Sequence, residues 1–102
     1  MIHMEDQHWK IVQEILNKYP YTFYAYGSRV KGTQKRFSDL DLCFIEPIPW
    51  NIRAHIDEDF EESDLPFKVD VIDWNLMASD FQELIKKDLA LVQTGSDKIL
   101  LL

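Results

Sequence analysis

Cysteine, glycine and proline are scarce in this sequence of 102 residues, and each shortage limits what the protein can be. The single cysteine, Cys43, excludes an internal disulfide and a cysteine-rich zinc site. It also fits a reducing compartment, so we expect a cytoplasmic protein. Three glycines and four prolines form no linker-like stretch. We therefore expect one domain over residues 1–102.

Long hydrophobic runs are also missing, and so are basic residues. No apolar stretch approaches the ~20 residues that cross a membrane, and no basic start precedes an apolar stretch as in a signal peptide. The 11 Lys and Arg are outnumbered by 18 Asp and Glu, which gives a net charge of −7. A surface of this charge repels polyanions. We therefore expect neither a membrane nor a long nucleic acid as partner.

Apolar residues are plentiful, at 46% of the sequence, and their spacing alternates between helical and strand periods. Helices are expected at 5–18, 28–34, 50–62 and 78–87, and strands at 21–26, 39–46, 67–74 and 89–92. Ser28 is expected to cap the second helix. The order α-β-α-β-α-β-α(-β) predicts an α/β or α+β fold in which helices flank a small sheet.

The dipeptide Gly27-Ser28 ends a predicted strand and opens a helix, which is typical of an anion-binding turn. Glycine lets the backbone approach an anion closely, and the serine hydroxyl adds a donor. A capped turn without a ligand would have the same sequence. Four of the eleven basic residues follow within this stretch and form a local positive patch: Arg29, Lys31, Lys35 and Arg36.

Two aspartates, Asp39 and Asp41, lie in an otherwise apolar strand and project from the same face. Neighbouring carboxylates resist ionising together unless a cation lies between them. Mg²⁺ prefers such ligands and usually takes one or two carboxylates together with substrate phosphates. For this pair alone, the alternative is that Asp39 is a turn residue and Asp41 an exposed edge residue.

A third aspartate, Asp70, lies in the next strand among β-branched residues that we expect to be buried, so its carboxylate needs a partner or a metal. If this strand is a neighbour of the strand that holds Asp41, three carboxylates face the phosphate-binding turn. That arrangement is typical of a two-metal phosphoryl-transfer site. Asp73 is the alternative to Asp70, but the strand period turns it to the opposite face.

This pattern of Gly-Ser, ten residues, Asp-x-Asp and a later strand aspartate resembles the signature of the DNA polymerase β-like nucleotidyltransferase superfamily. The short chain and the sequence Gly-Ser-Arg-Val-Lys-Gly…Ser-Asp-Leu-Asp-Leu are most similar to its minimal nucleotidyltransferase (MNT) subgroup. The resemblance covers most of the chain and implies a small mixed sheet with flanking helices. The matching residues are Gly27, Ser28, Asp39, Asp41 and Asp70.

The resemblance also implies the reaction, a Mg²⁺-dependent transfer of AMP from ATP to a hydroxyl. Asp39 and Asp41 would hold the ion that grips the nucleoside triphosphate, and Asp70 would join them at a second ion.

Four residues of the turn and helix would contact the nucleotide. Gly27 and Ser28 would bind the β- and γ-phosphates. Arg29 and Lys31 would add charge compensation, or they are solvated residues of the helix surface.

MNT proteins resemble the antitoxins of toxin–antitoxin pairs whose toxin is a helical HEPN ribonuclease. This resemblance implies transfer of AMP to a tyrosine of such a partner, in a hetero-oligomer. The alternative is a non-catalytic antitoxin that neutralises its partner by contact alone.

Two further features carry no function at this point. Six of the eighteen acids lie in 57–64, and we interpret them as a solvated helix face. The apolar tail Ile99–Leu102 would dock on a partner, or pack on its own core, or fray.

Overall fold

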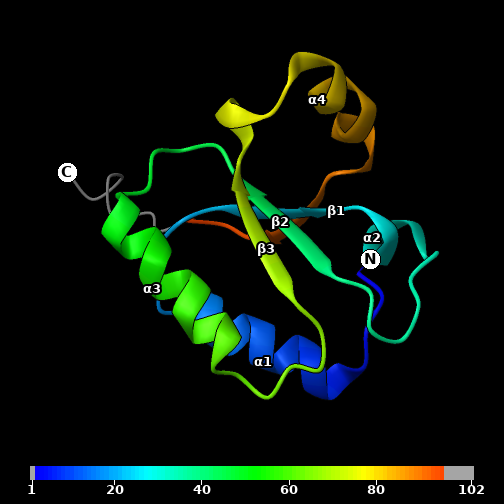
Figure 1. The fold of residues 1–102 in the computed structure, drawn as a ribbon, viewed down its shortest axis with the longest axis vertical. Coiled ribbons are helices and arrows are strands. Elements are labelled where there is room, and N and C mark those ends of the chain that lie inside the picture. The colour runs from blue at the N-terminus through cyan, green and yellow to red at the C-terminus, as the bar shows by residue number, and fades with distance from the viewer. Residues whose placement is uncertain (1, 96–102) are drawn as a thin grey trace.

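The computed structural model describes residues 2–95, which form a four-stranded sheet with helices around it (Figure 1). The strands are β1 (Phe23–Tyr26), β2 (Leu40–Phe44), β3 (Val69–Asp73) and β4 (Ala90–Gln93). The helices are α1 (Asp6–Leu16), α2 (Ser28–Lys31), α3 (Trp50–Glu61) and α4 (Ser79–Ile85), with short 3₁₀ turns at Trp74–Leu76 and Lys86–Asp88. This order confirms the expected arrangement, including its fourth strand.

The strand order is β3-β2-β1-β4, and the sheet is mixed. Strand β1 runs antiparallel to both β2 and β4, whereas β2 and β3 are parallel. Parallel neighbours need a crossover, and α3 supplies it between β2 and β3. The small mixed sheet implied by the family resemblance is therefore confirmed.

The main core lies between the sheet and the two longer helices, α1 and α3. Alternate residues of β2 point to this side, where Leu40, Leu42 and Phe44 are fully buried. They pack in one cluster with Val12 and Leu16 of α1 and Ile56 and Phe60 of α3. The two helices and this cluster therefore fix the direction in which the remaining side chains of β2 point, away from the core.

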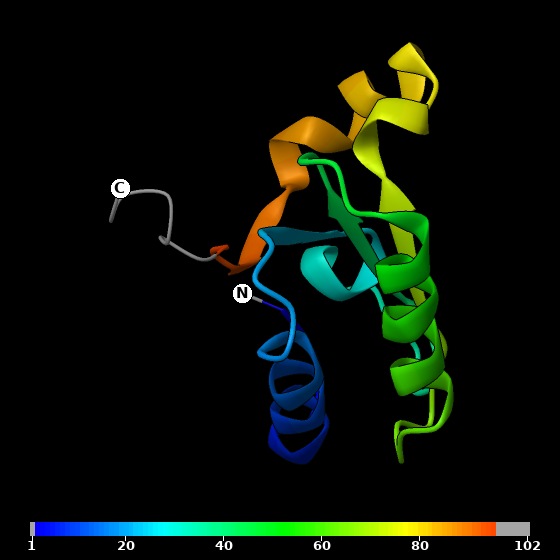
Figure 2. The same cartoon turned by 90° about the vertical axis from the view of Figure 1, so that its left-hand side faces the viewer.

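The opposite face of the sheet is only partly covered. A second, smaller cluster buries Tyr26, Cys43 and Ile85 beneath α4, which lies apart from α1 and α3 in Figures 1 and 2. Cys43 is a buried packing residue there. The rest of this face, at the α2 end of β2, stays open for the acidic residues described below.

Helix α2 is shorter than predicted and is not capped by Ser28. Gly27 occupies the N-cap position, no side chain caps the helix, and Gly32 ends it in the left-handed conformation with φ 79°. The prediction for Ser28 is therefore wrong. Because Gly27 makes the turn, Ser28 is the first helical residue instead.

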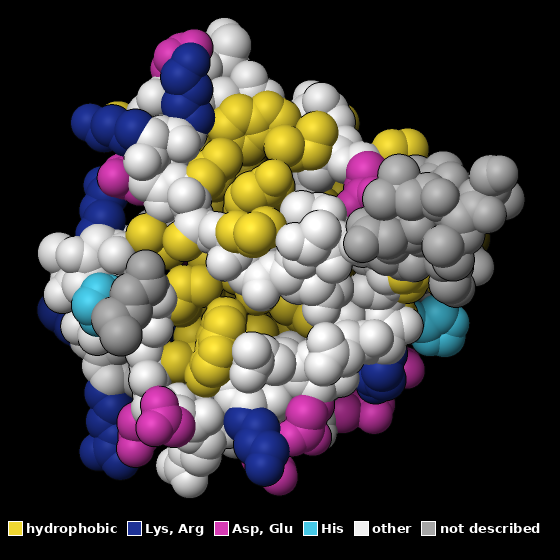
Figure 3. Space-filling view, turned by 180° about the vertical axis from the view of Figure 1, so that it is seen from behind, with side chains coloured by type: hydrophobic (Ala, Val, Ile, Leu, Met, Phe, Trp, Pro, Cys, Tyr) yellow, Lys and Arg dark blue, Asp and Glu magenta, His cyan; other side chains and the backbone are white. Residues whose placement is uncertain are grey.

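The surface is mixed in character. Figure 3 shows Lys and Arg side chains along the edge on which α2 lies, and hydrophobic side chains over the end that holds α4. The large exposed apolar residues near that end include Leu76, Phe81 and Leu84. Within residues 2–95, no helix has the length and apolar character needed to span a membrane.

Candidate active site

Three neighbouring strands place Tyr26, Asp41 and Asp70 in one row across the sheet. Tyr26 of β1 is the register partner of Asp41 in β2, and Asp41 is the register partner of Asp70 in β3. Residues paired in this way point to the same face and are separated by the strand spacing, about 4.8 Å. The sequence-based condition that the strands of Asp41 and Asp70 be neighbours is therefore met.

Asp39 lies one residue before β2 begins and is exposed. It lies two residues before Asp41, so an extended chain turns both side chains to the same face. Its charge is close enough to repel that of the Asp41 carboxylate. The chain therefore brings all three predicted aspartates to the same region of the open face.

The carboxylate of Asp41 lies in an unfavourable environment for a charge. Burial, followed by repulsion from Asp70 and then from Asp39, raises its pKa from 3.8 to about 6. Burial and the charges of Asp41, Cys43 and Asp70 likewise raise the pKa of Tyr26 to about 12. The row therefore concentrates negative charge, which a cation would relieve.

Gly27 is fitted tightly against Asp41. Its φ of 85° lies in the left-handed region, and a Cβ added to it would lie 2.6 Å from Asp41 Oδ2. Any other residue would therefore be strained and would displace the carboxylate. The backbone of the turn reaches the carboxylate only because no side chain separates them.

The turn also offers hydrogen-bond donors beside this carboxylate. The carbonyl of Gly27 accepts from the amides of Val30 and Lys31, at 3.1 Å each, so the helix begins there. The first N–H groups of a helix have no partner within it and remain available to an anion. The first two amides of α2, those of Ser28 and Arg29, lie where Gly27 and Ser28 were predicted to bind phosphate.

The three carboxylates are suited to a metal ion that is also coordinated by a bound substrate. Within residues 2–95, no three His, Cys, Asp or Glu side chains are grouped closely enough to form a complete metal site. Asp41 and Asp70 are nevertheless neighbours, and Asp39 lies within range to repel Asp41. Because Mg²⁺ usually combines one or two carboxylates with substrate phosphates, these residues fit that ion.

Asp70 is less buried than its β-branched neighbours suggested. Strand β3 lies at the edge of the sheet, the Asp70 side chain is 31% exposed, and Lys68 Nζ lies 3.3 Å from its Oδ1. Its partner in this structure is therefore a lysine at the surface. Asp73, the sequence-based alternative, instead accepts a hydrogen bond from the Asn75 amide at 2.9 Å.

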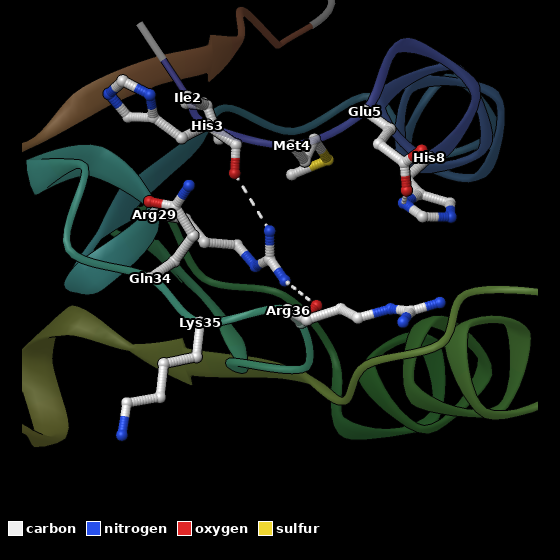
Figure 4. A pocket seen from close by; sticks show the side chains of 9 residues that line it. All are labelled: Ile2, His3, Met4, Glu5, His8, Arg29, Gln34, Lys35 and Arg36. Atoms are coloured by element: carbon white, nitrogen blue, oxygen red, sulfur yellow. Dashed lines mark hydrogen bonds and ion pairs between the residues drawn. The ribbon is translucent and has the colours of Figure 1, made fainter.

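Arg29 lies inside the protein, in contrast to the prediction of a solvated residue on the helix surface. It is 4% exposed, and its guanidinium donates to the Ser38 carbonyl at 2.9 Å. It also donates to the carbonyls of His3 and Arg36, at 2.9 and 3.2 Å (Figure 4). The guanidinium carbon also lies 4.1 Å from the centre of the Phe67 ring. Arg29 is thus not a solvated residue, and its contacts favour a structural role over contact with a nucleotide.

Lys31 lies at the surface, as its alternative interpretation required. Its side chain is 53% exposed and its Nζ is 3.9 Å from Asp88 Oδ2. Its predicted contact with a nucleotide stays a prediction.

Sequence reasoning missed two participants in this region, Tyr26 and Arg53. Tyr26 precedes Gly27 at the end of the predicted strand 21–26, and in the structure it ends the row that contains Asp41. Arg53 of α3 reaches the Val71 carbonyl next to Asp70, at 3.2 Å. The available sequence signal for Tyr26 was its position directly before the turn. Its place beside Asp41 depends on strand pairing, which the sequence does not show.

Comparison with known proteins agrees with this geometry. The model of the nucleotidyltransferase domain family matches residues 5–100. A Haemophilus influenzae protein named "Probable protein adenylyltransferase MntA" is 46% identical over 87 aligned residues, and the match covers 81% of this chain and 76% of that protein. In fold, the chain is similar to a crystal structure of a toxin–antitoxin with AMP-PNP, with a TM-score of 0.64 and 19% identity over 88% of this chain and 75% of the other. The chain belongs to the nucleotidyltransferase domain family, as its Gly-Ser and aspartate pattern predicted.

Proposed function

We propose that this nucleotidyltransferase is an antitoxin that transfers AMP from ATP to a tyrosine hydroxyl of a HEPN-class toxin. The observation that carries the proposal is the pairing of Asp41 with Asp70 beside the Gly27 turn. The name of the Haemophilus influenzae relative, a protein adenylyltransferase, supports a protein as acceptor. The toxin–antitoxin that shares the fold, solved with AMP-PNP, supports the antitoxin setting and an adenine nucleotide.

The carboxylates would bind the metal that the reaction needs. Asp39 and Asp41 would hold one Mg²⁺, and Asp70 would share a second with them. Bound Mg²⁺ supplies positive charge that offsets the negative charge of the phosphates in the transition state.

The turn and the edge strand would position the two reactants. The amides that follow Gly27, together with the Ser28 hydroxyl, would donate hydrogen bonds to the β- and γ-phosphates. Asp70, at the accessible edge of the sheet, would accept the proton of the acceptor hydroxyl. The hydroxyl oxygen then bonds to the α-phosphorus, the bond to the β-phosphate oxygen breaks, and pyrophosphate leaves.

The test is transfer of label from α-labelled ATP to the partner toxin in the presence of Mg²⁺. The wild-type protein should label the toxin, and the double variant Asp39→Ala/Asp41→Ala should lose at least about 10³-fold in rate, since it loses the metal ligands. Asp73→Ala is the matched control, because it removes an aspartate of the same sheet that points to the other face. It should retain near wild-type activity.

Two outcomes would contradict the proposal in different ways. Absence of label with the wild-type protein, while the double variant still neutralises the toxin, would establish the contact-only antitoxin. Loss of transfer in Asp73→Ala but not in Asp70→Ala would show that the second ion is held elsewhere.

A further inference from the structure

A groove runs along the outer edge of β3, between this strand and α3. It has a volume of about 620 Å³. Apolar side chains that include Phe60, Leu65 and Phe67 line it, and so do Asp70 and Ile72 from the open face of the sheet. The groove is therefore continuous with the proposed catalytic aspartate.

The edge of β3 has backbone groups that face this groove. The Leu40 amide donates to the Lys68 carbonyl at 2.9 Å, and in a parallel pair the residues that bond to the neighbouring strand alternate. Lys68, Asp70 and Ile72 therefore pair with β2, which leaves the backbone of Val69 and Val71 facing outward. An edge of this kind can accept a further strand.

Arg53 occupies only part of this edge. One of its terminal nitrogens donates to the Val71 carbonyl at 3.2 Å, which confirms that this carbonyl faces outward. Within residues 2–95, its Nε is buried without a hydrogen-bond partner. An unsatisfied buried donor is costly, and an acceptor group entering the groove would relieve that cost.

The charge of the groove favours a basic occupant. Three acids line it, Asp57, Glu61 and Asp70, against two bases, Arg53 and Lys68. Lys68 is held by Asp70. Burial raises the pKa of Asp57, and the charge of Arg53 only partly offsets that rise. Of the acidic run 57–64, Asp57 and Glu61 thus line this groove, whereas Asp59, Glu62 and Asp64 lie on the side that faces α1.

We propose that this groove binds an extended, basic segment of the acceptor protein, which adds to the edge of β3 and presents its hydroxyl side chain beside Asp70. The inference rests on the proposed transfer to a protein. A strand added at this edge would place alternate side chains on the open face, with the nearest about 5 Å from Asp70 between Cβ atoms. The other edge strand, β4, lies two strands further from Asp70 than β2 does and has no such relation to it.

Charge reversal at Glu61 tests the docking surface directly. Titration calorimetry would give the dissociation constant of the partner toxin for the wild-type protein, Glu61→Lys and Glu14→Lys. Glu61→Lys should weaken binding about tenfold, because it places a positive charge opposite a basic segment. Glu14→Lys is the matched control: Glu14 is an exposed acid of α1 outside the groove, and its reversal should change binding less than about twofold.

A second variant, Val69→Pro, tests backbone pairing. It removes an outward N–H that the sheet does not use, and proline is tolerated on edge strands. It should weaken binding of the toxin, and thermal unfolding would show whether the variant is folded. Wild-type affinity in folded Glu61→Lys would overturn the docking proposal, whatever the result for Val69→Pro.

Labelling separates this inference from the proposed function. Transfer of AMP with an unchanged dissociation constant in Glu61→Lys would leave the transferase function intact and reject the groove. Weakened binding in Glu61→Lys, without any transfer by the wild-type protein, would support the groove and reject the transferase.

Discussion

Gly27 is the residue at which backbone conformation and site chemistry meet. Its positive φ and its contact with Asp41 Oδ2 impose two separate demands for glycine. We expect Gly27→Ala to lose about 1–3 kcal/mol of unfolding free energy, because φ 85° with ψ −158° is a conformation essentially restricted to glycine. We also expect a drop of about 10²-fold in kcat for AMP transfer, because the carboxylate must move.

Gly32 provides a matched control for that experiment. It has a similar φ of 79°, but an added Cβ would meet the His3 ring at 3.3 Å instead of a catalytic carboxylate. Gly32→Ala should lose comparable stability and keep its kcat. Equal loss of kcat in both variants would attribute the effect to stability alone.

Asp41 links catalysis to stability through its ionisation. Its folded-state pKa is raised to about 6 from 3.8, so protonation favours the folded state. That stabilisation is complete below about pH 4 and is lost as the pH rises through about 6. Asp41→Asn avoids the loss, and we expect it to be more stable than wild type by about 1–2 kcal/mol at neutral pH, allowing for solvent screening.

Urea unfolding at two pH values checks this prediction. The stability difference between Asp41→Asn and wild type should be present near pH 7.5 and vanish near pH 3.5. The variant should be inactive in AMP transfer. A variant less stable than wild type at neutral pH would mean that Asp41 is stabilised by contacts other than those described.

At this scale the sequence predicted the aspartates better than the arginine. Asp39, Asp41 and Asp70 stood out because carboxylates are costly in apolar strands, and that cost is visible in sequence. The role of Arg29 was not visible, because its partners are backbone carbonyls from two separate segments. Carbonyls carry no sequence signature, so only the fold shows that they converge.

At the scale of elements, Arg29 ties α2 to the segments on either side of it. Its guanidinium joins the N-terminal segment at His3 to the loop that leads into β2 at Arg36 and Ser38. Asp39 directly follows Ser38, so this loop determines where the first carboxylate lies. Helix α2, whose basic side chains were predicted to compensate phosphate charge, is thus held in place by one of these side chains, that of Arg29.

Replacing Arg29 should therefore affect stability strongly. Arg29→Met leaves three carbonyls without their donor and a cavity at a buried side chain, and we expect a loss of about 2–4 kcal/mol in urea unfolding. Lys31→Met, a matched change on the same short helix, should alter stability by less than about 0.5 kcal/mol because Lys31 is exposed. Similar losses in both variants would show that α2 tolerates no change of charge, whatever its position.

The sequence predicted the elements themselves well, but not how the strands pair. Hydrophobic periodicity located all four strands. In β1 and β2, for example, apolar residues cluster or alternate between residues that interrupt a strand. The order β3-β2-β1-β4 depends on long-range pairing, and the apolar residues of β3 look alike whether the strand is central or at an edge. The expected burial around Asp70 is therefore met by Val71, which is 5% exposed, but not by Ile72, which is 37% exposed.

At the scale of the whole molecule, charge is divided between distinct regions. Lys and Arg side chains lie along the α2 edge (Figure 3), while the acidic residues Asp57 and Glu61 of α3 line the groove beside β3. The net charge of −7 still dominates at a distance. The C-terminal tail Ile99–Leu102, singled out in the sequence, lies outside the described residues.

The whole-molecule charge predicts poor binding of long nucleic acid. A single-stranded RNA of about 30 nucleotides should not be retained at about 100 mM salt, because phosphate contacts must overcome the net repulsion. ATP with Mg²⁺ should bind under the same conditions. Fluorescence anisotropy with labelled RNA and labelled ATP measures both, and RNA binding as tight as that of ATP would contradict the prediction.

The row of Tyr26, Asp41 and Asp70 has a consequence for how such a protein can change over time. The distance between its two carboxylates is set by the spacing of the hydrogen-bonded parallel strands β2 and β3, and therefore by the main chain. Side chains elsewhere on the surface do not determine this distance. Substitutions on helix faces and groove walls can therefore adapt the protein to a new acceptor while the two carboxylates keep their spacing.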